Sequence, residues 1–86
     1  MLNQSSVRVY PTLISSPSIH ISVSGSDVPV VVSVYDMSGR MVMTQSINAY
    51  GDTQIELPAG TQTGMYIVNC NTGQNSISTK VVYSSR

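Results

Sequence analysis

The chain has 86 residues, which is enough for one compact domain and too few for two separate hydrophobic cores. Four basic side chains balance four acidic ones, and charged residues make up only 9% of the sequence. Such a composition provides no basic field to gather phosphates, so we expect no nucleic-acid partner.

The single cysteine, Cys70, excludes an internal disulfide, and the sequence contains no Cys/His spacing typical of a metal site. No apolar run approaches the roughly 18 residues of a membrane span, and residues 1–6 lack the basic and apolar regions of a signal peptide. If the domain is exported, we expect its export signal on an upstream part of a longer protein.

Alternating β-branched residues predict strands, and no 3.6-residue apolar repeat persists long enough to predict a helix. We expect residues 12–17 to form a loop in which Leu13 and Ile14 close one end of the core. Short strands at this regular spacing predict an all-β fold, an immunoglobulin-like β-sandwich of about seven antiparallel strands. The expected strands cover residues 7–10, 18–23, 30–36, 40–47, 52–57, 65–71 and 77–83.

The alternation also predicts which side chains face the core. Tyr66 follows a loop rich in Gly, Pro and Thr, and we expect its hydroxyl to bind backbone upstream, as in the tyrosine corner of sandwiches. Cys70 shares the face of Tyr66 and is expected to be an inert, buried thiol. The expected core-facing side chains are Ile19, Ile21, Val23, Val30, Val32, Val34, Thr53, Ile55, Leu57, Tyr66, Val68 and Cys70.

A tight turn is predicted at residues 38–39, where Gly39 supplies the positive φ that a hairpin requires. Met37, Met41 and Met43 surround this turn, and flexible thioethers serve either as core filler or as an adaptable contact patch. We expect at least one of the three to fill the core.

No pattern of ionisable residues predicts catalysis. His20 is the only histidine and is expected on the solvent-facing side of a strand, and the four carboxylates stand singly on turns and strand ends. We therefore expect no enzyme, no cofactor, no metal and no small-molecule substrate.

Three segments of the sequence form one pattern: VRVYP at 7–11, VSVYDMSGRMV at 32–42, and GMYIV at 64–68, which contains Gly64 and Tyr66, followed by KVV at 80–82. Within the middle segment, Tyr35, Asp36, Gly39 and Arg40 combine a strand, a tight turn and a return strand, which makes it the most specific of the three. Together the three segments resemble the type A C-terminal sorting domain of the type IX (Por) secretion system. The chain departs from the family pattern at residues 12–13.

This resemblance implies a sorting domain at residues 7–86, with residues 1–6 as a linker or tail from an upstream protein. It implies that the domain travels with a passenger through the periplasm to the outer membrane and cell surface, or into the medium. The implied partners are the outer-membrane shuttle barrel, the translocon and a surface sortase.

In the resembled family the last strand and the C-terminal residues carry much of the export signal. An exposed edge strand at this place would be recognised by strand addition. The corresponding residues are Thr79, Lys80, Val81, Val82, Tyr83 and Arg86.

Two alternatives stay open at this stage. One is a retained interaction or signalling domain of a component of the secretion apparatus, and the other is an immunoglobulin-like adhesion module. An adhesion module would want exposed aromatic residues, whereas Trp and Phe are absent and the five tyrosines are scattered. Unpaired strand edges also allow a homodimer.

Overall fold

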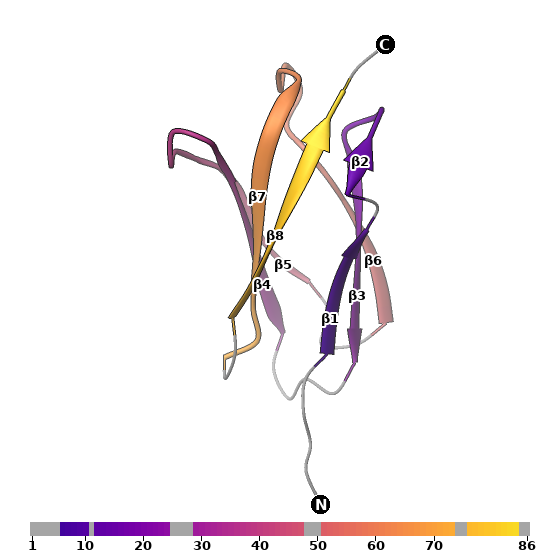
Figure 1. Ribbon diagram of the computed structural model, residues 1–86. Coiled ribbons are helices and arrows are strands. Elements are labelled where there is room, and N and C mark those ends of the chain that lie inside the picture. Colours follow the sequence, from indigo (N-terminus) through magenta and orange to yellow (C-terminus); the bar gives the residue numbers. More distant parts are fainter. Residues whose placement is uncertain (1–5, 11, 25–28, 48–50, 74–75, 85–86) are drawn as a thin grey trace, which may run out of the picture.

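The computed structural model describes residues 6–10, 12–24, 29–47, 51–73 and 76–84, and these form eight strands and no helix (Figure 1). None of them belongs to a helix that could cross a membrane. The strands are β1 (Ser6–Tyr10), β2 (Leu13–Ile14), β3 (Ser18–Ser24), β4 (Val30–Asp36), β5 (Met41–Ile47), β6 (Gly51–Glu56), β7 (Gly64–Asn71) and β8 (Ser76–Tyr83).

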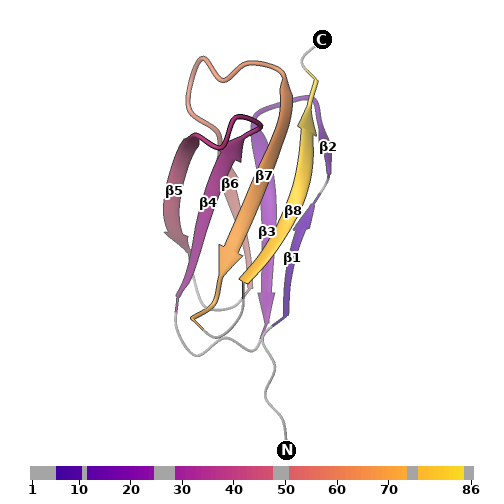
Figure 2. The ribbon, with the colours of Figure 1, turned by 60° about the vertical axis from the view of Figure 1, so that its left-hand side comes forward.

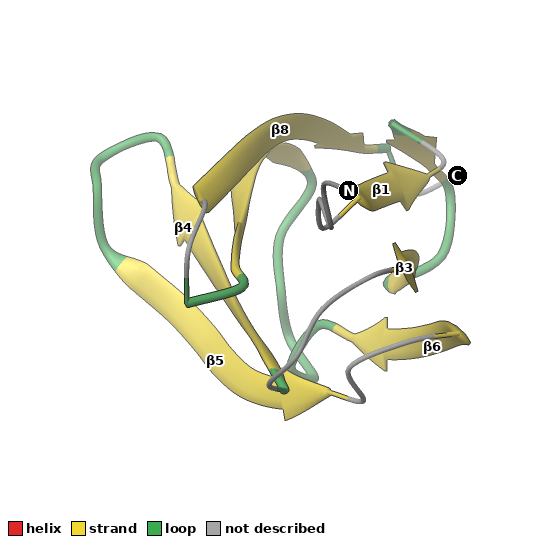
Figure 3. Cartoon of the chain, turned by 90° about the horizontal axis from the view of Figure 1, so that it is seen from below, coloured by secondary structure: helices red, strands yellow, loops and turns green. Residues whose placement is uncertain are grey.

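The strands build two sheets that pack face to face. One sheet has the order β1-β3-β6, and the other has the order β2-β8-β7-β4-β5. Figure 2 shows the larger sheet from the front, and Figure 3 shows the two layers from below, with β4, β5 and β8 opposite β1, β3 and β6. The predicted immunoglobulin-like β-sandwich is confirmed.

The core lies between the sheets, and its side chains come from every second residue of the central strands. Ile19 and Ile21 of β3 are fully buried and belong to the same core cluster as Val32 and Val34 of β4, which are also fully buried. The expected core-facing positions are confirmed as buried, apart from Thr53, which is half-buried. Cys70 is fully buried, as predicted.

The first difference from the sequence-based expectation is β2. Leu13–Ile14, expected in a loop, form a two-residue strand that pairs in parallel with β8. Ile14 closes the core, at 4% exposed, but the expectation for Leu13 was wrong, because this side chain is 67% exposed. Two residues are too few to show alternation, so the sequence pattern could not reveal a strand here.

The second difference is an irregularity in the hairpin of β4 and β5. The register shifts between Val34 and Tyr35, because Val34 pairs with Met43 whereas Tyr35 pairs with Met41. Val42 is therefore an extra residue on β5, as in a β-bulge. Met43 packs against the core, which confirms the expectation for at least one of the three methionines, while Met37 and Met41 are exposed.

The buried faces generate a first prediction. We expect Ile21→Ala to lower the free energy of unfolding by about 2 to 5 kcal/mol, because the substitution leaves a cavity between the sheets. Val31→Ala is the matched control, since Val31 lies on β4 but is 41% exposed, and its effect should stay within about 0.5 kcal/mol. Urea unfolding of both variants measures the difference, and equal losses would contradict the inward assignment of Ile21.

Candidate functional site

Five of the six residues expected to form the recognition signal lie along β8, on both faces of the sheet. Val81 is fully buried, and Thr79 and Tyr83 on the same face are half-buried. Lys80 is exposed on the outer face, where it pairs with Ile67 of β7. Arg86 lies outside the described residues.

One edge of β8 is partly covered by β2. The N–H of Val82 donates to the carbonyl of Thr12 at 2.8 Å, and the N–H of Ser84 donates to the carbonyl of Ile14 at 2.9 Å. These contacts fix the direction in which the backbone groups of β8 point, since the groups of alternate residues face opposite edges of a strand.

Upstream of Val82 the same edge is open. The pairing of β8 with β7 runs without interruption from residue 76 to residue 83, so Ser78 and Lys80 have the same backbone direction as Val82. Among the described residues, no strand pairs with residues 76–81 on this side. The N–H and C=O groups of Ser78 and Lys80 are therefore presented to solvent as an unpaired strand edge.

At the far end of the sheet, Asp36 organises the turn between β4 and β5. Its Oδ1 accepts hydrogen bonds from the N–H of Ser38 at 2.9 Å, the hydroxyl of Ser38 at 2.6 Å and the N–H of Arg40 at 3.0 Å. Gly39 has a φ of 91°, a conformation that suits glycine, as the sequence predicted. The hydroxyl of Ser38, followed by the N–H of Arg40, holds the pKa of Asp36 below its ordinary value.

Tyr66 fixes the loop that connects β6 and β7. Its ring is buried at 7% exposed, and its hydroxyl donates to the carbonyl of Gln62, which confirms the predicted tyrosine corner. Within the same loop, Thr61 donates through its N–H at 3.1 Å and its hydroxyl at 2.6 Å to the carbonyl of Pro58. Gly64, another residue of the resembled motif, begins β7 opposite Tyr83.

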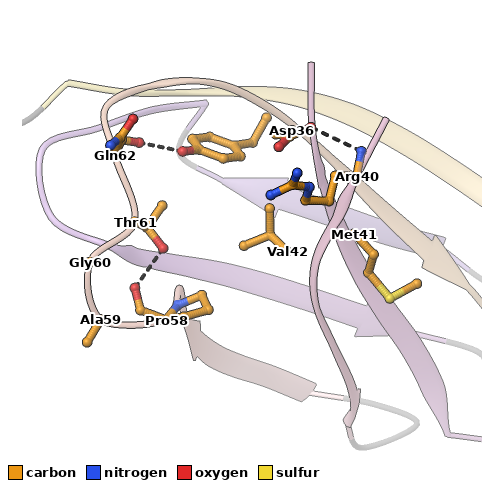
Figure 4. A pocket seen from close by; sticks show the side chains of 10 residues that line it. Asp36, Arg40, Met41, Val42, Pro58, Ala59, Gly60, Thr61 and Gln62 are labelled. Atoms are coloured by element: carbon orange, nitrogen blue, oxygen red, sulfur yellow. Dashed lines mark hydrogen bonds between the residues drawn. The ribbon is translucent and has the colours of Figure 1, made fainter. Parts of the chain in front are cut away.

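A cleft of about 500 Å³ lies between this loop and the turn of β4 and β5 (Figure 4). The Arg40 guanidinium points across it toward the loop. One wall is formed by the hairpin and the other by the loop, and the lining residues are Asp36, Arg40, Met41, Val42, Pro58, Ala59, Gly60, Thr61, Gln62 and Tyr66. The motif residues Asp36, Arg40 and Tyr66 thus meet at one cleft, whereas Tyr35 does not line it.

Among the described residues, the other titratable groups are not gathered into a site. His20 stacks on Tyr10 with ring centroids 5.4 Å apart and is half-buried, on the outer face of the smaller sheet. In the part of the chain that the structure describes, no three His, Cys, Asp or Glu residues converge as metal ligands. Burial raises the pKa of the Cys70 thiol to about 11, which keeps it protonated at neutral pH.

Three parts of this arrangement were not predicted from the sequence. The role of Ser38 had a signal, because an Asp two residues before a Ser in a glycine-containing turn is typical of a side chain that binds backbone within the turn. The contact of Thr12 and Ile14 with β8 had none, since it joins opposite ends of the sequence. The cleft also combines segments that are distant in sequence.

Comparisons with known proteins agree with the fold and the motifs. A family model described as "Secretion system C-terminal sorting domain" matches residues 8–84. No curated protein matches the sequence. Among solved structures, the chain is similar to a β-glucuronidase of Faecalibacterium prausnitzii, with a TM-score of 0.66 and 17% identity.

That structural match covers 94% of this chain but only 14% of the β-glucuronidase chain. At such low identity the likeness shows a shared fold and nothing about activity.

The tyrosine corner generates a prediction on stability. Tyr66→Phe removes the hydroxyl that donates to the Gln62 carbonyl, and we expect the free energy of unfolding to fall by about 1 to 2 kcal/mol. Tyr35→Phe is the matched control, because the Tyr35 hydroxyl makes no hydrogen bond with another described residue. Thermal and urea unfolding measure both, and a Tyr66→Phe variant as stable as the control would show that the bond contributes nothing.

The turn generates a prediction on pH. The pKa of Asp36 is lower in the folded chain than its ordinary value of 3.8. Its contribution to stability is therefore complete well above pH 3.8 and disappears as the pH falls through the lower folded value. Ser38→Ala removes the largest cause of the shift, so the carboxyl of Asp36 should titrate at higher pH in this variant.

Carbon-detected NMR of the Asp36 carboxyl in both proteins follows this titration directly. Coinciding titration curves would mean that the Ser38 hydroxyl does not stabilise the ionised carboxylate.

Proposed function

This chain belongs to the family of C-terminal sorting domains of the type IX secretion system, and we propose that it carries an upstream passenger across the outer membrane by presenting the open edge of β8 to the secretion machinery. The family match, which covers residues 8–84, is the observation that carries the proposal. The family is a sorting-signal family and not an enzyme family, and its members are exported to the outer membrane, the cell surface or the medium.

The open edge of β8 supports recognition by strand addition. Its unpaired backbone groups at Ser78 and Lys80 provide main-chain hydrogen bonds for an incoming strand, and the exposed Lys80 side chain adds a charge that a partner can select. The surrounding strand is polar, with Ser76 and Ser78 both accepting hydrogen bonds from Asn69. At Ser78 and Lys80 an incoming strand would pair with β8 without disturbing the core, because β2 and its buried Ile14 stay in place.

The β2 strand divides the signal into two parts. Thr79 and Lys80 precede the contact with β2, whereas Val82 and Tyr83 are paired with Leu13 and Ile14. We infer that the machinery contacts the open part first and reaches the rest of the edge by displacing β2. Val81 contributes by keeping the strand packed on the core, and Arg86 lies outside the described residues.

The proposed partners are the outer-membrane shuttle barrel and the translocon, followed by a surface sortase. The domain at residues 7–86 would pass through the periplasm with its passenger, joined to it through residues 1–6. The second open edge of the larger sheet, β5, is the proposed surface for a homodimer through an edge strand.

The edge hypothesis gives a sharp prediction for a reporter protein fused to this chain and expressed in a bacterium with type IX machinery. Ser78→Pro removes the outward N–H of the open edge and leaves the hydrogen bonds with β7 in place, so we expect surface delivery to fall several-fold. Ser78→Ala is the matched control, since it loses the hydroxyl but keeps the N–H, and it should be delivered as the unchanged chain is.

Thermal unfolding of both purified variants confirms that they are folded. A folded Ser78→Pro variant delivered at the unchanged level would contradict strand addition at this edge. A reporter that stays periplasmic even with the unchanged domain would contradict the sorting function as a whole and favour a retained component of the apparatus.

A further inference from the structure

The cleft between the β4–β5 turn and the 58–62 loop is a second surface with binding character, on elements other than the β8 edge. Its lining combines the cation Arg40, the carboxylate Asp36, an apolar wall and a loop held by hydrogen bonds (Figure 4). None of these features is needed for strand addition at β8.

Both walls of the cleft are held in place before any ligand binds. Asp36 Oδ1 accepts three hydrogen bonds from the turn, which fixes the backbone of Arg40. On the other side, the loop is tied by Thr61 to the Pro58 carbonyl and by the Tyr66 hydroxyl to the Gln62 carbonyl. Binding here would therefore order little of the backbone, which favours affinity.

The cation in the cleft has unused binding capacity. The guanidinium of Arg40 makes no hydrogen bond or ion pair with another described residue, and only the backbone N–H of Arg40 is bound. Five N–H donors in a planar fork are thus available, a geometry that matches a carboxylate. Attraction to nearby Asp36 offsets part of the positive charge, which favours one carboxylate over a polyanion such as nucleic acid.

The apolar wall lies beside this cation. Met41 is 49% exposed, Val42 is half-buried, and both line the cleft together with Pro58 and Ala59. A flexible methionine adapts to different apolar partners. A ligand that places an acidic group on Arg40 and an apolar group on Met41 would contact both.

We propose that this cleft binds an extended acidic segment of a partner protein, with a carboxylate held by the Arg40 guanidinium and a neighbouring apolar side chain packed against Met41 and Pro58. An extended peptide fits because its side chains alternate between the floor and the rim of a cleft with two walls. Because Arg40 is the one cation among the lining residues, the recognised segment needs one carboxylate at this point.

The probe for this proposal is a capped hexapeptide with one glutamate among valine and threonine, compared with the same peptide carrying glutamine. Amide signals of the full ¹⁵N-labelled chain are followed during titration with each. We expect the glutamate peptide to shift residues 40–42 and 60–62, and to bind about tenfold more tightly than the glutamine peptide.

Three variants test whether the Arg40 guanidinium is the group that binds the glutamate of the peptide. Arg40→Gln keeps the backbone N–H that binds Asp36, so it should stay folded and lose about tenfold in affinity. Arg40→Lys keeps the charge but not the fork and should bind with intermediate affinity. Arg8→Gln removes an exposed cation outside the cleft and should bind as the unchanged chain does.

The proposal is overturned if both peptides bind equally, if Arg40→Gln binds as the unchanged chain does, or if the shifts lie along β8 instead. Shifts at residues 40–42 that depend on protein concentration without peptide would assign the cleft to a second copy of this chain and also overturn it. If the domain binds neither peptide but still delivers the reporter to the cell surface, this proposal is wrong and the proposed sorting function is unaffected.

Discussion

The Tyr66 ring is buried in the core, and its part-buried hydroxyl donates to the Gln62 carbonyl, a bond on which the loop around it depends. The bond fixes the loop between β6 and β7, which carries the chain from one sheet to the other. It also holds the start of β7, the strand on which both β4 and β8 are aligned. This one hydrogen bond therefore supports the crossing between the two sheets, one wall of the cleft and, through β7, the β8 strand that is proposed to be recognised.

The strand edges of the sandwich differ in how far they are covered by a neighbouring strand. A strand that is buried on one face and paired on one side only still has a row of free backbone groups, and such edges invite pairing with other chains. On β8, β2 covers the last residues of this edge, and no other strand in the described part of the chain pairs with residues 76–81 there. A sorting domain needs an exposed recognition site on a stable fold, and a partly covered strand edge provides both.

Much of the fold could be predicted from the sequence, because every second side chain of a strand lies on the same face and the apolar face is the one that is buried. Val30, Val32 and Val34 had to face one side of a strand, and all three are fully buried. The β2 strand could not be predicted, since it has two residues and pairs with the opposite end of the chain. The motif around Asp36 and Gly39 predicted the turn, but the cleft depends on how that turn packs beside a distant loop, which no local pattern encodes.

The most direct measurement of the central claim is amide hydrogen exchange of the full chain, alone and bound to the purified outer-membrane shuttle barrel. In the free chain, no strand of the described residues pairs with the N–H groups of Ser78 and Lys80 on the side away from β7, and these groups should exchange rapidly. If the shuttle barrel adds a strand at this edge, both N–H groups become protected in the complex. A complex that forms while these two amides continue to exchange rapidly would contradict recognition through the open edge of β8.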